Sequence, residues 1–197
     1  KNSEILFINN NGNIKIKYNK CNIYTPCIFE YIYLARAESI INNISVYEAR
    51  IKMGEMLSYK IKKQLGNEIN NIDYIVPVPD TSRPATLEIS KILNIPYYEI
   101  IIKNRYIPRT FIMNSQKERY NKIKKKLSIV KRYAKNKNLL IIDDSIVRGN
   151  TIKYIIEILK KYGVNKIYLG SYSPPIRYIN KYGIDIPTEK ELIANKL

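Results

Sequence analysis

The sequence of 197 residues contains no histidine and no tryptophan, and only two cysteines, Cys21 and Cys27. The absence of histidine excludes catalytic triads and every other mechanism that uses an imidazole base. Two cysteines are too few for a disulfide framework, and without histidine they are also too few for a zinc site. Because so little cysteine is typical of cytoplasmic proteins, we expect a cytoplasmic location.

Long apolar runs and a secretory signal are also missing. No stretch approaches the roughly 18 consecutive apolar residues of a membrane span, so we expect no membrane partner. The chain begins Lys1-Asn2-Ser3-Glu4, without an initiator methionine and without a signal-peptide pattern. We therefore expect a product that is trimmed at its amino end.

Acidic residues are scarce, with 17 against 34 basic ones, which gives a net charge of +17. Such a charge is common in nucleic-acid-binding proteins. However, lysine, isoleucine, asparagine and tyrosine are all heavily used, as in an A+T-rich coding sequence, and no nucleic-acid-binding signature accompanies the charge. We therefore favour compositional bias and do not expect a nucleic-acid partner. A site for a small polyanion would also use basic residues.

The most informative stretch combines a short apolar run, two carboxylates, a glycine loop and a helix. Residues 139–142 predict a buried parallel strand, Asp143 and Asp144 follow it, and a loop around Gly149 leads into a helix at 151–162. Loop amides and a helix N-terminus can bind a phosphate, and carboxylates can hold sugar hydroxyls or hydrated Mg²⁺. The alternative for a bare acidic pair is an ordinary turn with solvated carboxylates.

Alternation of strands and helices predicts an α/β fold with a mostly parallel sheet. The capping box Ser45-Val46-Tyr47-Glu48 predicts a core-facing helix that ends at Gly66. We expect its apolar face to contain Val46, Ala49, Met53, Met56, Leu57, Ile61 and Leu65. Further strands are predicted at 74–78, 97–102 and 166–171, and further helices at 84–93, 115–127 and from 189 to 195.

The amino-terminal part predicts a β-hairpin, because residues 4–8 and 14–18 flank an Asn-Gly turn. Residues 26–36 are apolar and aromatic, and their composition predicts a strand.

Two further segments carry polar groups that suit an anionic ligand. The turn 79–83 follows a parallel strand, and Thr81 and Ser82 lie at the start of the next helix, on the same sheet edge as Asp143. Hydroxyls at this position usually cap the helix, but here they also suit a pyrophosphate cradle. The long connection 103–116 carries several cations and has no periodicity, as is typical of a lid.

Three strings together resemble one known family. They are PCIFEYIYLAR at 26–36, KNRYIPRTFI at 103–112 and DDSIVRG at 143–149. The last resembles the phosphoribosylpyrophosphate (PRPP) signature of type I phosphoribosyltransferases, and the whole set resembles the amidophosphoribosyltransferase family, over about residues 22 to 194. The resemblance implies a type I phosphoribosyltransferase fold, with a mostly parallel sheet, flanking helices and a loop-rich hood, preceded by a short β-hairpin.

The resemblance also implies a reaction, in which ammonia displaces pyrophosphate from PRPP to give 5-phosphoribosylamine, the first step of purine synthesis. Asp143 and Asp144 would hold the ribose hydroxyls and Mg²⁺, and Thr81 and Ser82 would serve the pyrophosphate, with Thr81 near the metal. The 5-phosphate loop would comprise Ser145, Ile146, Val147, Arg148, Gly149, Asn150 and Thr151. The closing lid would use Lys103, Arg105, Tyr106 and Arg109. The sequence departs from the family where Asn150 replaces a threonine and Pro108 a glycine.

The family's organisation implies that residues 1–20 are the last hairpin of a glutaminase domain, and that 21–197 form a phosphoribosyltransferase domain truncated at its C-terminus. Ammonia would come from solution or, in the intact enzyme, from glutamine through a separate glutaminase domain or subunit, and we expect a homo-oligomer. Some relatives bind an iron–sulfur cluster through a cysteine at position 27, but another ligand position is Asn180 here. We therefore expect Mg²⁺ but no cluster, and we expect Cys27 to be a packing residue.

Two other functions remain open at this point. One is a non-catalytic PRPP-sensing regulator on the same fold, with nucleic acid as its partner. The other is a phosphoribosyltransferase that acts on a nucleobase.

Overall fold

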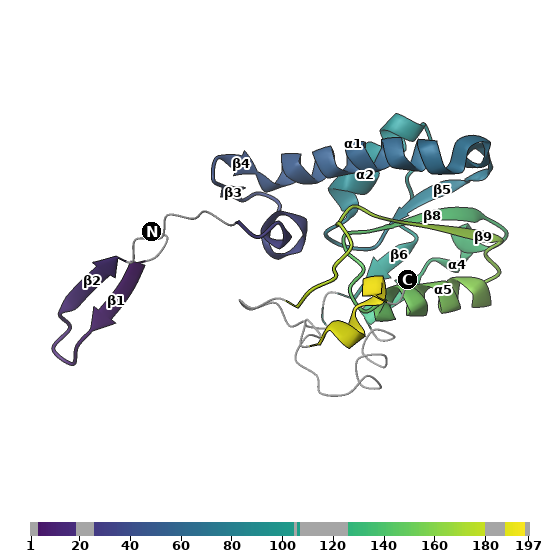
Figure 1. The fold of residues 1–197 in the computed structure, drawn as a ribbon. Helices are drawn as coiled ribbons and strands as arrows, with labels where there is room; N and C mark the ends of the chain where they lie inside the picture. Colours follow the sequence, from purple (N-terminus) through teal and green to yellow (C-terminus); the bar gives the residue numbers. More distant parts are fainter. Residues whose placement is uncertain (1–3, 19–25, 105, 107–125, 180–187, 196–197) are drawn as a thin grey trace.

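The computed structural model describes residues 4–18, 26–104, 106, 126–179 and 188–195. Figure 1 shows a short parallel sheet between layers of helix, with an antiparallel hairpin at the amino-terminal end of the chain. No helix in the described ranges is both long and apolar enough to cross a membrane.

The central sheet is parallel and has β8 in its middle. It consists of β5 (Tyr74–Pro77), β8 (Asn138–Asp143) and β9 (Lys166–Ser171), in the order β5-β8-β9. The last residue of β8, Asp143, pairs with the last residue of β9, Ser171. The carboxyl ends of the strands therefore share one edge of the sheet, as predicted from the alternation of strands and helices.

Helices cover both faces of this sheet. Figure 1 shows α1 (Val46–Leu65) and α2 (Arg83–Leu93) above it and α5 (Asn150–Lys161) below it. These helices confirm the predictions at 46–65, 84–93 and 151–162. The capping box is present, since the Ser45 side chain accepts a hydrogen bond from the amide of Glu48.

The side chains of β8 alternate between the two faces, because successive residues of a strand point to opposite sides. Leu140 and Ile142 belong to the apolar cluster that includes Ile61 of α1 and Ile89 of α2. Leu139 and Ile141 belong to the cluster that includes Ile152, Ile155 and Leu159 of α5. The strand is therefore buried on both sides, which accounts for its uninterrupted apolar sequence.

The inner face of α1 differs from the predicted apolar stripe. Met56 is 53% exposed, whereas Arg50, Gly54 and Ser58 are buried. The two helices α1 and α2 approach closely at Gly54, where a β-carbon would lie 2.4 Å from the carbonyl oxygen of Ala85 in α2. Small residues and residues with polar contacts therefore replace apolar ones along part of this face.

The strand predicted at 97–102 divides into two parts. Tyr97 forms a single parallel bridge with Ile75 of β5. The regular strand β6 (Ile101–Lys103) instead pairs antiparallel with β7 (Leu127–Ile129). Leu127 was expected at the end of a helix and lies in this strand. Residues 115–125 of that predicted helix are outside the described residues.

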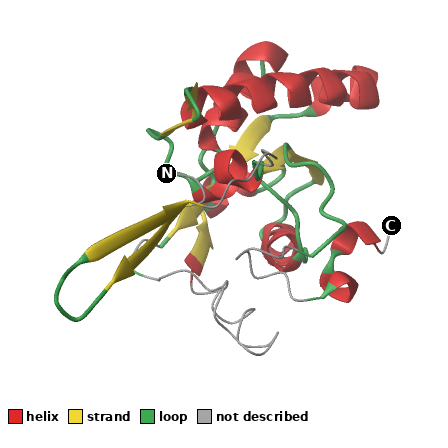
Figure 2. Ribbon diagram, turned by 60° about the vertical axis from the view of Figure 1, so that its left-hand side comes forward, coloured by secondary structure: helices red, strands yellow, loops and turns green. Residues whose placement is uncertain are grey.

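Both ends of the described chain contain further short elements. The predicted hairpin is confirmed: β1 (Glu4–Ile8) pairs with β2 (Ile14–Tyr18), and Figure 2 shows the pair as two long strands joined by a loop. At the other end, the predicted helix at 189–195 consists of two 3-10 turns, Glu189–Glu191 and Ile193–Asn195.

Residues 26–36 are not a strand. They contain a π-helical turn, Glu30–Leu34, in which only Ile32 is buried. Cys27 is exposed, so the expectation that it packs in the interior is wrong. The remaining small elements are β3 (Ile40–Ile41), β4 (Ile44–Ser45), a 3-10 helix at Gly66–Asn71 and α4 (Lys131–Ala134).

Candidate functional site

The acidic pair ends the central strand and is buried. Asp143 is 6% exposed and Asp144 is 8% exposed. The Asp144 amide donates a hydrogen bond to the Asp143 carboxylate at 2.9 Å, and the Ser145 hydroxyl donates to the Asp144 carboxylate at 2.7 Å. The alternative of an ordinary turn with solvated carboxylates is therefore wrong.

Burial disfavours the negative charge of both groups. It raises the pKa of Asp144 to about 6, although the hydroxyls of Ser145 and Thr81 and the charge of Arg50 act in the opposite direction. Burial also raises the pKa of Asp143, and the neighbouring Asp144 carboxylate adds to this shift. A ligand that brings positive charge or hydrogen-bond donors would therefore stabilise the charged form of both carboxylates.

The turn after β5 lies directly beside the pair. The Val78 amide donates to the carbonyl of Ile142 at 2.8 Å, which ties this turn to the end of β8. The Thr81 hydroxyl is close enough to the Asp144 side chain to lower its pKa, so the structure brings these two predicted metal ligands together.

The Ser82 hydroxyl bonds within its own turn. Its side chain is fully buried, and its hydroxyl donates to the Val78 carbonyl at 2.6 Å. The Ser82 carbonyl in turn accepts from the Thr86 hydroxyl at 2.7 Å. The Ser82 hydroxyl therefore closes the turn and faces the protein instead of a pyrophosphate.

The loop 145–149 leads from the acidic pair into α5, and its shape requires glycine at one position. Gly149 has φ = 77°, and a β-carbon there would lie 2.9 Å from Cδ1 of Ile193. Gly149 is also the N-cap of α5, so the N-cap residue has no side chain to cap the amides of the first helical turn. Uncapped amides at the start of a 12-residue helix are a suitable site for a phosphate.

The two carboxyl-terminal 3-10 turns, Glu189–Glu191 and Ile193–Asn195, contact this loop. Arg148 forms an ion pair with Glu191, and its side chain is only 14% exposed. The Ile193 amide donates to the Val147 carbonyl at 3.0 Å. These contacts give Arg148 a role in fixing the loop, in addition to the substrate contact predicted for it.

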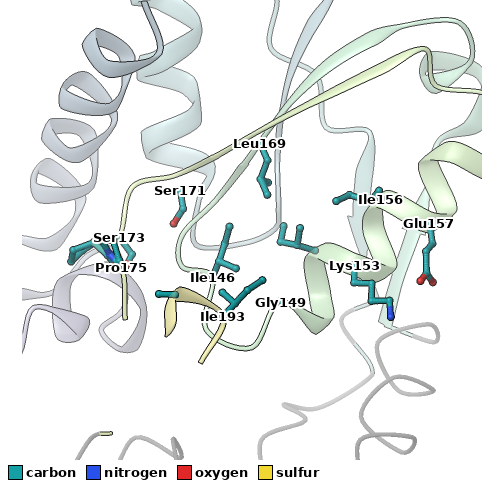
Figure 3. A pocket seen from close by; sticks show the side chains of 13 residues that line it. Ile146, Gly149, Lys153, Ile156, Glu157, Leu169, Ser171, Ser173, Pro175 and Ile193 are labelled. Atoms are coloured by element: carbon teal, nitrogen blue, oxygen red, sulfur yellow. The ribbon is translucent and has the colours of Figure 1, made fainter. Parts of the chain in front are cut away.

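An apolar pocket of about 550 Å³ lies between this loop, α5, the end of β9 and the carboxyl-terminal turns. Figure 3 shows Ile146 and Ile193 facing it from the two segments. Because the Ile146 side chain lines this apolar space, only its backbone remains for a polar ligand. The pocket is therefore adjacent to the loop 145–149 but does not itself suit a charged group.

The lid residues are only partly within the described structure. Lys103 ends β6 and forms an ion pair with Asp80 of the turn after β5. Tyr106 is 96% exposed, and the structure does not bring it to the acidic pair. Arg105 and Arg109 lie outside the described residues, as does most of the predicted lid.

The donor set of the site suits one kind of metal ion. In the described part of the chain no group of three or more histidine, cysteine, aspartate or glutamate side chains could hold a metal ion. Two carboxylates and one hydroxyl are nevertheless suitable for Mg²⁺, which is commonly bound by one or two carboxylates together with substrate phosphates.

Comparison with known proteins identifies the family. The model of the phosphoribosyl transferase domain matches residues 43–172, a range that contains the acidic pair, the Thr81 turn and the glycine loop. This chain belongs to the phosphoribosyl transferase domain family. The fold predicted from the family resemblance is therefore confirmed.

Within this family the chain is similar to amidophosphoribosyltransferases. The Haemophilus influenzae protein of that name is 49% identical over 172 residues, and the Saccharomyces cerevisiae protein is 47% identical over 173. The structure of the Bacillus subtilis glutamine PRPP amidotransferase, complexed with ADP and GMP, has a TM-score of 0.74 and 37% identity, over 99% of this chain and 41% of that one. The two sequence matches span 87–88% of this chain, but only 34% of each relative.

Two side chains of this phosphoribosyltransferase site were missed by sequence reasoning. Arg50 is buried on α1 and donates to the carbonyls of Tyr31 at 2.9 Å and Ala35 at 2.8 Å. Burial lowers its pKa, and the charge of Asp144 acts in the opposite direction. Arg50 therefore joins the segment 26–36 to the site. The one signal in the sequence was an arginine within an apolar helical stripe.

Tyr172 makes a similar connection from the other side. Its hydroxyl lies within hydrogen-bond distance of two carbonyl oxygens, that of Thr81 at 3.2 Å and that of Ile32 at 3.4 Å. Burial raises the pKa of Tyr172, and the neighbouring Asp144 carboxylate raises it further. The tyrosine therefore remains a neutral donor that steadies the backbone of the Thr81 turn. Nothing in the local sequence of a loop after β9 indicates this role.

Proposed function

We propose that this chain carries the phosphoribosyl-transfer site of an amidophosphoribosyltransferase, where ammonia displaces pyrophosphate from PRPP and 5-phosphoribosylamine is formed. The observation that supports this most strongly is the buried pair Asp143 and Asp144, with the Thr81 hydroxyl on one side and the glycine loop on the other. These groups match the ribose, the pyrophosphate and the 5-phosphate of one molecule.

The protein's task in this reaction is positioning and charge stabilisation. The carbon that loses pyrophosphate develops positive charge in the transition state, and Asp143 and Asp144 are placed to favour it while they hold the ribose hydroxyls. The loop 145–151 binds the 5-phosphate through its amides and the start of α5. Asn150 replaces a family threonine at this loop, but the backbone amides do not depend on that side chain.

The pyrophosphate end of PRPP is assigned to the turn after β5 and to β6. Thr81 supplies a hydroxyl, and Lys103, with Arg105 and Arg109 as further proposed ligands, supplies positive charge. When bound, Mg²⁺ would neutralise the pyrophosphate charge, and Asp143, Asp144 and Thr81 are the residues that would hold it.

Ammonia is a nucleophile that needs no protein base, which is compatible with a sequence without histidine. In the proposed intact protein, a glutaminase domain or subunit supplies the ammonia from glutamine, with the hairpin 1–20 as the end of that domain. Residues 21–197 are then the phosphoribosyltransferase domain, and the assembly is a homo-oligomer. No observation in the described part of the chain favours the alternative of a nucleic-acid-binding regulator.

The test is pyrophosphate release from PRPP by the purified chain of 197 residues. With Mg²⁺ and an ammonium salt we expect pyrophosphate to appear at a rate proportional to protein concentration. Glutamine should not replace ammonia, because this chain has no amino-terminal cysteine nucleophile. A rate with ammonia no higher than that of a heat-inactivated sample would contradict the proposed function.

A further inference from the structure

The turn after β5 contains an acidic residue in the place where a pyrophosphate is expected to bind. Asp80 directly precedes Thr81, whose hydroxyl is close enough to Asp144 to lower the pKa of that carboxyl. Its carboxylate accepts hydrogen bonds from two cations at once, Lys103 through one oxygen and Arg83 through the other. A carboxylate at this position repels the ligand that the turn is proposed to bind, so its presence needs an explanation.

The two cations that contact Asp80 are held in different ways. Arg83 donates to Asp80 at 2.9 Å, and it also donates two parallel hydrogen bonds to Glu99, both at 2.9 Å. The Glu99 carboxylate in addition accepts from the Tyr97 hydroxyl at 2.9 Å. Arg83 is therefore fixed by a planar bidentate pair that does not depend on Asp80.

Lys103, in contrast, contacts Asp80 through a single ammonium group at the end of a flexible side chain. It is the last residue of β6, and its backbone is fixed by pairing with Leu127 of β7. Its side chain is 29% exposed and that of Asp80 is 42% exposed. Partly exposed pairs of this kind contribute little net stability, so a polyanion can displace the carboxylate.

We propose that the Asp80 carboxylate competes with pyrophosphate for Lys103. It pairs with this lysine at the turn while the site is empty, and the lysine moves to pyrophosphate oxygens when polyphosphate binds. This inference rests on the proposed function, because it takes the turn to be the pyrophosphate site. Asp80 then has two consequences. It keeps Lys103 close to its ligand, and it lowers the affinity for pyrophosphate, which favours release of that product.

The test is a double-mutant cycle with inorganic pyrophosphate and Mg²⁺ as the probe, measured by isothermal titration calorimetry. Asp80→Asn should bind pyrophosphate about two- to fivefold more tightly than the wild type, the range expected for loss of one partly exposed ion pair. In a Lys103→Met background the same Asp80→Asn change should alter pyrophosphate affinity much less, because the lysine for which Asp80 and pyrophosphate compete is absent. Asp80→Glu, which keeps the charge, should retain wild-type affinity.

The matched control is Glu88→Gln on α2, which removes the same charge from a partly exposed pair with Lys91. It should leave pyrophosphate affinity unchanged, and the thermal unfolding of each variant reports whether it is folded. Unchanged or weaker binding by Asp80→Asn, or an equal gain with and without Lys103, would overturn the inference while leaving the proposed function intact. A wild-type chain that binds no pyrophosphate would instead contradict the proposed function, and the inference with it.

Discussion

The carboxylates at the end of β8 and the carboxylate in the turn after β5 lie at the same edge of the sheet, but their environments are opposite. Asp143 and Asp144 are less than 10% exposed, and their pKa values are raised because burial is not balanced by paired cations. Asp80 is 42% exposed on its side chain and is paired with both Arg83 and Lys103.

This difference indicates how each segment relates to a ligand. Among the residues that the structure describes, the charge of Arg50 does not offset the burial of the pair, so a ligand with a metal ion or hydroxyl donors improves its environment. The turn already has its own cations, so a ligand must take one of them from Asp80. A ligand therefore relieves unfavourable burial of charge at Asp143 and Asp144, whereas in the turn after β5 it must replace an existing ion pair.

The largest expected effect is on the free energy of unfolding, which Asp144→Asn should raise and Asp80→Asn should lower. Asp144→Asn imitates the protonated side chain that burial favours. A pKa raised from 3.8 to about 6 corresponds to about 3 kcal/mol, so the variant should be more stable than the wild type by up to that amount at pH 8. Asp80→Asn should instead lose roughly 0.2–1 kcal/mol, since it breaks partly exposed ion pairs. Urea unfolding of both variants measures the difference.

The pH dependence gives an independent check on the same comparison. Between about pH 4 and pH 6 the folded protein holds a proton on Asp144 that the unfolded chain has released, so wild-type stability from this group falls as pH rises through that window. The stability gap between Asp144→Asn and the wild type should therefore be largest at pH 8 and should shrink towards pH 4. A difference in stability between the two proteins that stays constant from pH 8 to pH 4 would mean that the charge of Asp144 does not destabilise the folded protein.

A smaller effect is expected where the phosphate loop meets the carboxyl-terminal turns. Gly149→Ala introduces a side chain at positive φ and against Ile193, and should cost about 2 kcal/mol of stability and weaken PRPP binding. Gly12→Ala is the matched control, because Gly12 has a similar φ of 75° with nothing within 4 Å of the added carbon. Equal losses in the two variants would show that the contact with Ile193 is unimportant.

The smallest effect concerns the ion pair that holds the loop. Glu191→Gln removes one charged partner of Arg148, and should cost about 1 kcal/mol and raise the KM for PRPP several-fold with little change in kcat. Glu189→Gln makes the same change of charge at an exposed position two residues earlier. Steady-state kinetics in which both variants match the wild type would limit the role of the carboxyl-terminal turns to packing.

The parts of the site that sequence reasoning found are those encoded within one short segment. The strand, acidic pair, glycine loop and helix of residues 139–162 follow from local periodicity, glycine position and composition, and the structure has each of them. The turn with Thr81 was found in the same way, because it follows a strand and begins a helix.

The contacts that were missed join residues that are far apart in the chain. Tyr172 contacts the carbonyl of Ile32, 140 residues away, and Arg148 pairs with Glu191, 43 residues away. Such contacts depend on how loops meet at the sheet edge, which no local pattern encodes. The direction of the Ser82 hydroxyl does not follow from the sequence for a related reason, since a hydroxyl at a helix start can face either a ligand or its own turn.

The most direct test of the proposed site uses calorimetry to measure Mg²⁺-dependent binding of PRPP to the wild type and to the double variant Asp143→Asn/Asp144→Asn. We predict that the wild type binds PRPP with Mg²⁺ and that the double variant, although folded, binds at least roughly tenfold more weakly, as expected when charged hydrogen-bond acceptors are lost. Glu88→Gln should bind like the wild type. Equal affinity of the double variant and the wild type would contradict the assignment of the acidic pair as the ribose and metal site.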